Sequence, residues 1–354
     1  MILAVGFVSF VGVNLTEYLY RVRIFLNFPQ DLLMVDNHRI LLLMPALNEE
    51  RGLDSLLQQI PEYIDKLILV DDGSEDLTAE IAKKHGATIV THATTRGLGV
   101  AFLNGLKEAL KHPFDILVNM DSDGQFNPAD ISKLINPIIQ NSADFVTASR
   151  FIDEDLYPAM PKSKFYGNRY MAKFISFLTG QKFHDVSCGF RAYSFDTVLK
   201  INLFGSYTYT QESFLDLSFK GARIVEVPVK VLGERENGKS RIASNLFKYG
   251  YSTFAIIVRS FRDYKPLRLF LYLAVICSLL SFGFGVFLGI HYIKVGVFTP
   301  HKWAGFVGGF FFIIGLLFTL IGFILDMFAR MRLNQELLLY ELKKNDYLRK
   351  NNKI

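Results

Sequence analysis

Cysteine is scarce in this sequence, and its scarcity excludes several kinds of site. Only Cys188 and Cys277 occur among 354 residues, and they lie far apart. Two such cysteines can form neither a disulfide framework nor a cysteine-based zinc site. Internal repeats and low-complexity tracts are lacking as well. The net charge of +5 is modest and does not predict a nucleic-acid partner.

Hydrophobic residues, in contrast, make up 50% of the chain, Phe occurs 33 times and the mean hydropathy is +0.23, which together are too apolar for an ordinary soluble protein of this length. Two runs near the C-terminus, residues 269–290 and 303–325, contain no charged residue. At ~1.5 Å of rise per residue, each helix would span roughly 33 Å, about the thickness of a bilayer's hydrocarbon core. We expect a transmembrane hairpin rather than a pair of buried core helices.

Basic residues flank this predicted hairpin on its two outer sides. They are Lys248, Arg259, Arg262, Lys265 and Arg268 before the first run, and Arg330, Arg332, Lys343 and Lys344 after the second. The positive-inside rule then places the N-terminal domain and the C-terminal tail in the cytoplasm. We therefore predict an integral, multi-pass protein of the cell membrane that contacts membrane lipids. Residues 1–13 are also apolar but too short to span a bilayer, so an interfacial segment is expected there.

Between these apolar segments, short apolar runs alternate with amphipathic helical stretches. The strand candidates are residues 40–44, 67–70, 88–91, 116–119 and 224–232, and the helix candidates are residues 52–64, 78–85 and 99–111. Strands separated by helices predict an α/β fold with a mainly parallel, doubly wound sheet flanked by helices.

Polar and mostly acidic residues follow three of these strands. They are Asn48 with Glu49, Asp71 with Asp72, and Asp121 with Asp123. In parallel sheets, ligands gather at the carboxyl ends of the strands. The alternation of Asp121, Asp123 and Gln125 directs their side chains to one side of an extended backbone. Their oxygens would suit Mg²⁺ or Mn²⁺, although an acidic turn without a ligand remains an alternative.

Seven motifs occur in the order found in family 2 glycosyltransferases. They are PALNEE at 45–50, DDGS at 71–74 with Asp76, GLGVA at 97–101 with Gly105, DSD at 121–123, SRF at 149–151, DVSCGFR at 185–191 and RENGKS at 235–240. With the C-terminal hairpin, the chain resembles the polyprenyl-phosphate branch of that family, which includes dolichol-phosphate mannose synthases and bactoprenol glucosyltransferases. The resemblance covers roughly residues 40 to 330.

The resemblance implies a GT-A-type, Rossmann-like fold and five segments. We expect an N-terminal apolar or interfacial segment (1–38), a GT-A catalytic domain (39–240), interfacial amphipathic helices (241–266), two transmembrane helices (267–328) and a cytoplasmic charged helical tail (329–354). The activity implied is inverting transfer of a hexose, glucose or mannose, from a UDP- or GDP-sugar to undecaprenyl or dolichyl phosphate. Small-residue patterns in the spans leave a homo-oligomer open.

The resemblance also implies roles for individual residues. The donor nucleoside would be held by Pro45, Leu47, Glu49, Asp71 and Asp72, its sugar or diphosphate would lie near Glu212 and Arg235, and its phosphates would lie near Ser240 and Arg241. The metal ion would be held by Asp121, Asp123 and Gln125. The acceptor phosphate would meet Arg150, Lys164 and Asn168. Relatives often have Arg and Ser where this chain has Lys164 and Asn168. Arg169 is therefore a rival for the phosphate.

A phosphate acceptor would need little activation. Its second pKa is ~6, so it is already an anionic nucleophile near neutral pH. Catalysis would then rest on a cation at Asp121 and Asp123 that stabilises the leaving diphosphate, and on Arg150 and Lys164, which position the acceptor.

Three other activities are weighed against this one. Within the family, the acceptor could be the hydroxyl of a glycolipid or polysaccharide, which would require a general base. GERENGKS at 233–240 fits the phosphate-loop pattern of a nucleotide hydrolase, but its two glutamates suit phosphate poorly. An inactive membrane scaffold is the third. A dinucleotide-binding fingerprint fails because Phe102 stands where its third glycine belongs.

Overall fold

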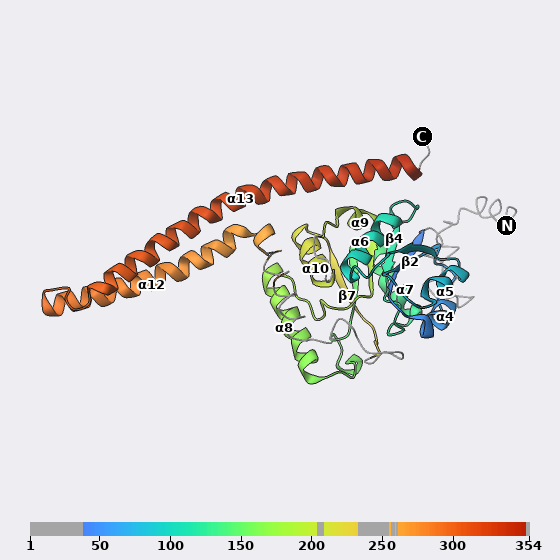
Figure 1. The fold of residues 1–354 in the computed structure, drawn as a ribbon, viewed down its shortest axis with the longest axis horizontal. Helices are drawn as coiled ribbons and strands as arrows, with labels where there is room; N and C mark the ends of the chain where they lie inside the picture. Colours follow the sequence, from blue (N-terminus) through green and yellow to red (C-terminus); the bar gives the residue numbers. More distant parts are fainter. Residues whose placement is uncertain (1–37, 204–208, 233–254, 256–258, 260, 352–354) are drawn as a thin grey trace, which may run out of the picture.

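We describe a computed structural model of the chain. It describes residues 38–203, 209–232, 255, 259 and 261–351 (Figure 1). The predicted site residues Arg235, Ser240 and Arg241 lie outside this part of the chain, as do the phosphate-loop pattern at 233–240 and most of the predicted interfacial segment 241–266.

The part of the chain before the predicted hairpin contains a seven-stranded sheet in the order β3-β2-β1-β4-β6-β5-β7. The strands are β1 Ile40–Ala46, β2 Lys66–Asp71, β3 Thr88–Thr91, β4 Ile116–Asn119, β5 Phe145–Ser149, β6 Arg191–Ser194 and β7 Ile224–Pro228. All neighbouring strands are parallel except at β6, which is antiparallel to both β4 and β5. The predicted mainly parallel sheet is confirmed, and β5 and β6 are two strands that the sequence analysis did not predict.

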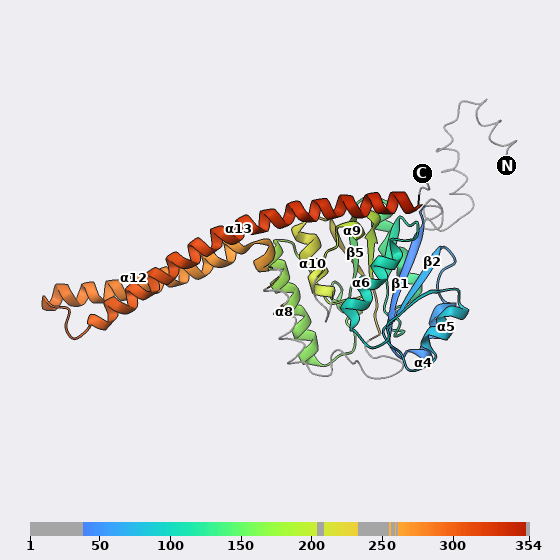
Figure 2. The same ribbon diagram turned by 45° about the horizontal axis from the view of Figure 1, so that its top comes forward.

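Helices cover both faces of the sheet (Figures 1 and 2). They are α4 Glu50–Gln58, α5 Thr78–Lys84, α6 Leu98–Ala109, α7 Ile131–Ile139, α8 Lys162–Thr179, α9 Phe195–Lys200 and α10 Thr210–Phe219, with short turns η1 Pro128–Asp130 and η2 Glu154–Leu156. The helix predicted at 52–64 ends earlier because Pro61 follows and cannot donate a helical hydrogen bond.

The pleat of β1 explains the two layers. Leu41 and Leu43 enter a hydrophobic cluster with residues of α6, α8 and α10, whereas Leu42 and Met44 enter a second cluster with residues of α4, α5 and α7. All four side chains are fully buried. A strand buried on both faces reads as a continuous apolar run, which is why β1 is visible in the sequence.

The parallel register brings three strand ends to one edge of the sheet. Ala46 at the end of β1 pairs with Asp71 at the end of β2, and Leu43 of β1 pairs with Asn119 at the end of β4. The loops that carry the predicted site residues therefore leave the sheet side by side.

Two long apolar helices follow the catalytic part: α12 Pro266–Val295 and α13 Lys302–Asn351. They run antiparallel and project from the domain as a hairpin (Figures 1 and 2). By length and composition both could cross a membrane. In their most apolar 18-residue stretches, only 6% and 17% of the residues are buried in the structure. This confirms the two apolar helices expected from the sequence.

Glycines let the two helices approach each other. A Cβ atom on Gly322 would lie 3.1 Å from Cβ of Phe270, and one on Gly315 would lie 3.3 Å from the carbonyl oxygen of Ala274. Gly308 makes a similar approach to Phe284. These small residues, spaced by seven, serve contacts inside the hairpin.

Helix α13 does not end where the apolar run ends. It continues for 50 residues in all and lies along the catalytic domain (Figure 2). Near its end Tyr347 is buried, its ring centre is 4.3 Å from that of Phe195, and its hydroxyl accepts a hydrogen bond of 3.1 Å from the backbone N–H of Phe114. The Lys343 ammonium donates to the carbonyl oxygen of Ile201 at 2.9 Å. The segment predicted as a tail from residue 329 thus belongs to the same helix as the second apolar run.

We predict that Tyr347→Ala destabilises the domain by about 3 kcal/mol, because it leaves a cavity beside two aromatic rings and removes the partner of a buried amide. The measurement is chemical unfolding in detergent. Lys350→Ala, on the same helix but with 52% of its side chain exposed, is the control and should change little. Equal midpoints for the two variants would contradict this docking of α13.

Candidate active site

The loops after β1 and β2 form one hydrogen-bonded platform. The N–H of Asn48 donates to Oγ of Ser74 at 2.9 Å, and the N–H of Glu75 donates to Oδ1 of Asn48 at 2.8 Å. The N–H of Glu49 donates to Oγ1 of Thr78 at 2.9 Å. The predicted donor residues Pro45, Leu47 and Glu49 therefore lie in or beside a loop that the β2–α5 loop holds in place.

Asp71 and Asp72 are both buried at this edge. Oδ1 of Asp71 accepts from the N–H of Ser74 at 2.9 Å. The carboxylate of Asp72 pairs with Nδ1 of His92 at 2.7 Å and accepts from the N–H of Gly97, the N-cap of α6, at 2.9 Å. Asp72 thus places its negative charge at the start of a helix, which is electrostatically favourable. Its contacts hold the loop that leads into α6.

Asp121 and Asp123 leave the end of β4 on either side of buried Ser122. The Ser122 hydroxyl donates to the carbonyl oxygen of Pro45 at 2.8 Å, so the ends of β4 and β1 are tied together. Oδ1 of Asp123 accepts from the N–H of Gln125 at 3.1 Å. Nε2 of Gln125 donates to the carbonyl oxygen of Leu232 at 2.8 Å. The amide nitrogen, not the Oε1 that a cation would need, is used in that bond.

Gly189 lies directly against the Asp121 carboxylate. A Cβ atom at position 189 would be 2.7 Å from Oδ2 and 3.0 Å from Oδ1 of Asp121. The carbonyl oxygen of Gly189 accepts from Nδ2 of Asn119 at 2.8 Å, which fixes this strand-to-loop approach. Only glycine gives the carboxylate this space.

The donor set suits a divalent ion shared with a substrate. Across the described ranges, no three His, Cys, Asp or Glu side chains are grouped to hold a metal ion. Mg²⁺ is commonly bound by one or two carboxylates together with substrate phosphates. Asp121, Asp123 and the amide oxygen of Gln125 fit that pattern, since a bound diphosphate would supply the other oxygens.

Arg150, directly after β5, is held by a buried carboxylate. Its Nε and Nη2 atoms donate to Asp185 at 2.6 and 2.9 Å, and Nη2 also donates to Oγ of Ser187 at 2.8 Å. Burial alone would raise the pKa of Asp185, but the charge and hydrogen bonds of Arg150 outweigh it and hold that pKa below its usual range. Oγ of Ser187 also lies 3.2 Å from Oδ1 of Asn168 in α8. The predicted acceptor residues Arg150 and Asn168 are thus joined through Ser187, and half-buried Lys164 stands in the first turn of the same helix.

A thiolate is not available next to this ion pair. Cys188 is buried, and burial raises the pKa of its thiol to about 12. Cys188 is therefore not a nucleophile near neutral pH.

Arg191 is a further residue of the site for which the sequence analysis assigned no role. It is fully buried at the start of β6, where Nε donates to the carbonyl oxygen of Cys188 at 2.7 Å. Its Nη1 atom donates to the carbonyl oxygen of Thr210 at 3.0 Å and to Oγ of Ser213 at 2.6 Å. Arg191 therefore connects the segment beside Asp121 to helix α10. The arginine that closes the DVSCGFR motif was the available sign.

Glu212 lies on the first turn of α10 and is buried. It lines a small cavity together with Asp216, one helical turn later, and with Tyr264 and Arg332 from the hairpin region. The structure thus places Glu212 between the catalytic domain and the base of the hairpin.

Comparison with known proteins now decides the family. Residues 42–201 match the family described as Glycosyl transferase family 2. The chain is 33% identical over 215 residues to the UDP-N-acetylglucosamine–dolichyl-phosphate N-acetylglucosaminyltransferase of Methanococcus voltae, covering 54% of this chain and 85% of that one. It is 30% identical over 219 residues to the undecaprenyl-phosphate mannosyltransferase of Micrococcus luteus, covering 59% and 89%. The chain is a family 2 glycosyltransferase.

A solved structure supports the fold of this glycosyltransferase. The glucosyl-3-phosphoglycerate synthase of Mycobacterium tuberculosis, crystallised with Mn²⁺, UDP and its product, matches with a TM-score of 0.51 at 19% identity. The match covers 64% of this chain and 81% of that one. It shows that the catalytic part has the GT-A fold.

We predict that Gly189→Ala lowers the turnover of the glycosyltransferase by about 100-fold, because the added methyl group displaces the Asp121 carboxylate. Enzyme kinetics at saturating Mn²⁺ check this, with thermal melting as the test of folding. Gly309→Ala, where a Cβ atom would meet nothing within 4 Å, is the matched control. A fully active Gly189→Ala enzyme would show that Asp121 need not stay where the structure puts it.

A second prediction concerns acid stability. Because the pKa of Asp185 is lowered in the folded state, its contribution is complete above the unfolded carboxyl pKa of ~3.9 and is lost as pH falls through the folded value. Asp185→Asn should therefore cost about 3–5 kcal/mol at pH 7, and the deficit should shrink below pH ~4. Unfolding at several pH values measures it. Asp144→Asn, in a more exposed pair with Arg223, should cost clearly less; a deficit independent of pH would contradict the ion-pair explanation.

Proposed function

We propose that the glycosyltransferase moves a hexose from a UDP- or GDP-sugar to a polyprenyl phosphate and yields a polyprenyl-phosphate sugar. The observation that carries this proposal is the joining of an acidic GT-A edge to two helices long enough to span a membrane. The hairpin would hold the acidic edge close to the membrane, where a lipid phosphate is found. The names of the two relatives, one a dolichyl-phosphate and one an undecaprenyl-phosphate sugar transferase, support the same acceptor class.

The donor would lie on the platform of the β1–α4 and β2–α5 loops. Pro45, Leu47, Glu49 and Asp71 would face the nucleoside there, while Asp72 holds the loop next to it. Asp121, Asp123 and Gln125 would hold Mg²⁺ or Mn²⁺ against the diphosphate. When bound, that ion supplies charge stabilisation for the leaving nucleoside diphosphate.

The acceptor phosphate would enter from the N-terminal end of α8. Lys164, in the first turn of α8, would meet the phosphate, and Arg150, paired with Asp185, would act mainly through Ser187 and Asn168 to hold α8. The phosphate is anionic near neutral pH, with a second pKa of ~6, so it attacks without a general base. Attack opposite the leaving group inverts the anomeric carbon.

Helix α8 would rest on the membrane surface. It crosses the end of the domain nearest the hairpin (Figure 2), and it exposes Tyr166, Tyr170 and Phe177 by 55%, 69% and 74%. Aromatic side chains of this kind favour the membrane–water interface. By the positive-inside rule, the catalytic domain would lie on the cytoplasmic face.

The test is transfer by the full-length enzyme in lipid nanodiscs with undecaprenyl or dolichyl phosphate and a panel of UDP- and GDP-sugars. We expect a lipid-linked sugar from one donor, no product in EDTA, and recovery with Mn²⁺ or Mg²⁺. Product only with a hydroxyl acceptor, or nucleotide hydrolysis without any transfer, would overturn the proposal.

Within this assay, Asp123→Asn should lower kcat by about 100-fold or more, because the leaving diphosphate loses part of its charge stabilisation. Asp54→Asn, at a carboxylate with 59% of its side chain exposed, is the matched control and should leave the rate unchanged. A normal rate for Asp123→Asn would remove the cation from this position.

A further inference from the structure

One tyrosine links the base of the hairpin to helix α10. Tyr264 stands two residues before the start of α12, and its hydroxyl donates a hydrogen bond to Asp216 of α10. Its ring centre is 5.2 Å from that of Phe219, also in α10, and the Arg332 guanidinium of α13 lies 4.6 Å from the ring centre on another side. A single side chain thus touches α10 and both arms of the hairpin base.

Asp216 gives this contact its strength. Only 3% of its side chain is exposed, and Lys220 pairs with it at 2.9 Å. The N–H of Asn202 donates to its other oxygen at 3.3 Å. Burial raises the pKa of Asp216 although Lys220 and Tyr264 stabilise the charged form. Loss of the tyrosine hydroxyl would leave a buried carboxylate with one donor fewer, a costly change.

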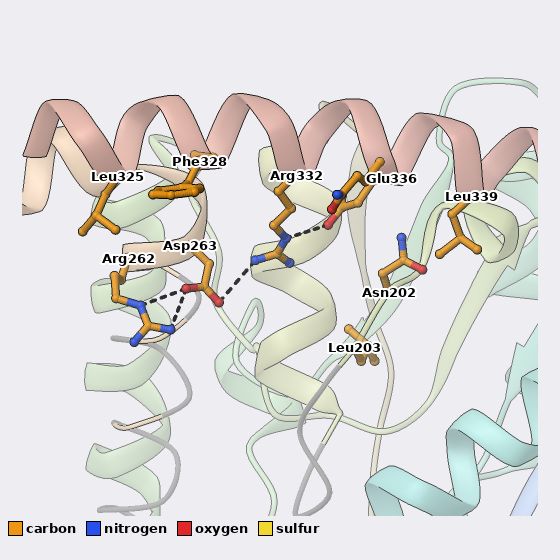
Figure 3. Close-up of a pocket in the computed structure, with 11 residues that line it drawn as sticks. Asn202, Leu203, Arg262, Asp263, Leu325, Phe328, Arg332, Glu336 and Leu339 are labelled. Atoms are coloured by element: carbon orange, nitrogen blue, oxygen red, sulfur yellow. Dashed lines mark hydrogen bonds and ion pairs between the residues drawn. The ribbon is translucent and has the colours of Figure 1, made fainter.

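Glu336 of α13 also reaches the end of α10: it pairs with Lys220 at 3.1 Å, and the two side chains are only 12% and 10% exposed. A cavity of about 630 Å³ lies under α13, and Figure 3 shows a chain of ion pairs along it. In this series of ion pairs, Asp263 pairs with Arg262 at 2.8 Å and with Arg332 at 3.2 Å, and Arg332 pairs with Glu336 at 2.9 Å. The side chains of Arg262 and Asp263 are 51% and 24% exposed. These pairs join residues of the hairpin and of the segment before it to one another and do not reach α10. The buried contacts to α10 are therefore the Tyr264–Asp216 bond and the Lys220–Glu336 pair.

Helix α10 leads from this link to the active site. Glu212 precedes Asp216 by one turn, and both line the small cavity that Tyr264 closes. At the start of the same helix, Arg191 holds Thr210 and Ser213, and Arg191 also holds Cys188 next to Gly189. A shift of α10 would therefore reach both Glu212 and the segment that confines Asp121.

We infer that Tyr264 is a positioning residue, which acts through Asp216 to set α10, and with it Glu212 and the Gly189 segment, relative to the membrane hairpin. The inference rests on the glycosyl transfer proposed above. It assigns a role in turnover to a residue that contacts neither donor nor metal ligands. A purely structural anchor would instead change stability and leave the kinetic constants of the folded enzyme unaltered.

The experiment compares Tyr264→Phe with Tyr340→Phe in nanodiscs. Both variants remove a tyrosine hydroxyl that bonds to an aspartate across the hairpin–domain contact, since Tyr340 of α13 donates to Asp196 of α9. Only Tyr264 reaches α10. We expect kcat to fall about tenfold in Tyr264→Phe, with the donor KM within about twofold of wild type. Tyr340→Phe should keep the wild-type kcat. Tyr264→Phe should melt at the lower temperature because its bond is buried, so kcat is compared at a temperature at which both variants are fully folded.

Equal kcat values for the two variants, or a loss of kcat that only follows a lower melting temperature, would overturn the inference. Wild-type enzyme is assayed alongside the variants. If the proposed function is wrong, no sample transfers sugar to the lipid phosphate. If only the inference about Tyr264 is wrong, the wild-type enzyme still transfers it.

A double-mutant cycle gives a second, independent test. If Tyr264 acts through Asp216, then Tyr264→Phe combined with Asp216→Asn should lose no more activity than the worse single variant. Additive losses would show that the two residues act separately and would also overturn the inference.

Discussion

The antiparallel strand β6 is the constraint on which the site depends. Parallel strands β4 and β5 both end at the active edge of the sheet, and β6 runs between them in the opposite direction. The chain that enters β6 must therefore pass through that edge. This one reversal brings Asp185 to Arg150 and Gly189 to Asp121. A sheet with every strand parallel would have left residues 185–190 on the far side.

Buried charge accompanies this arrangement. Arg191 and Asp185 are both fully buried, and each is satisfied by several partners close to the predicted metal and acceptor positions. Groups of this kind are expensive to leave unpaired, so they specify one arrangement of the surrounding loops. The hydrogen bonds of Arg191 and Asp185 thus hold the loops around the acidic edge in place.

Much of the fold could be predicted because β1, β2 and β4 are buried on both faces and end in conspicuous acids. Strands β5 and β6 were missed, since they are short and include polar residues such as Thr147 and Arg191. The motif order suggested which residues serve the donor, but not that Asp72 turns toward His92 and Gly97.

The pairing of Arg150 with Asp185 joins positions 35 residues apart, and no local pattern encodes it. The charged helical tail expected from residue 329 continues the second apolar helix without a break, and pairs such as Asp326 with Arg330 support this continuity.

That uninterrupted helix has a mechanical consequence. With 50 residues and a rise of ~1.5 Å each, α13 is a rod of roughly 75 Å that begins in the apolar hairpin and ends beside Phe114. In a membrane, such a continuous helix would hold the domain at one height above the apolar layer. The enzyme would then select lipid acceptors by the depth of their phosphate group in the membrane. The length of the lipid's hydrocarbon chain would matter far less.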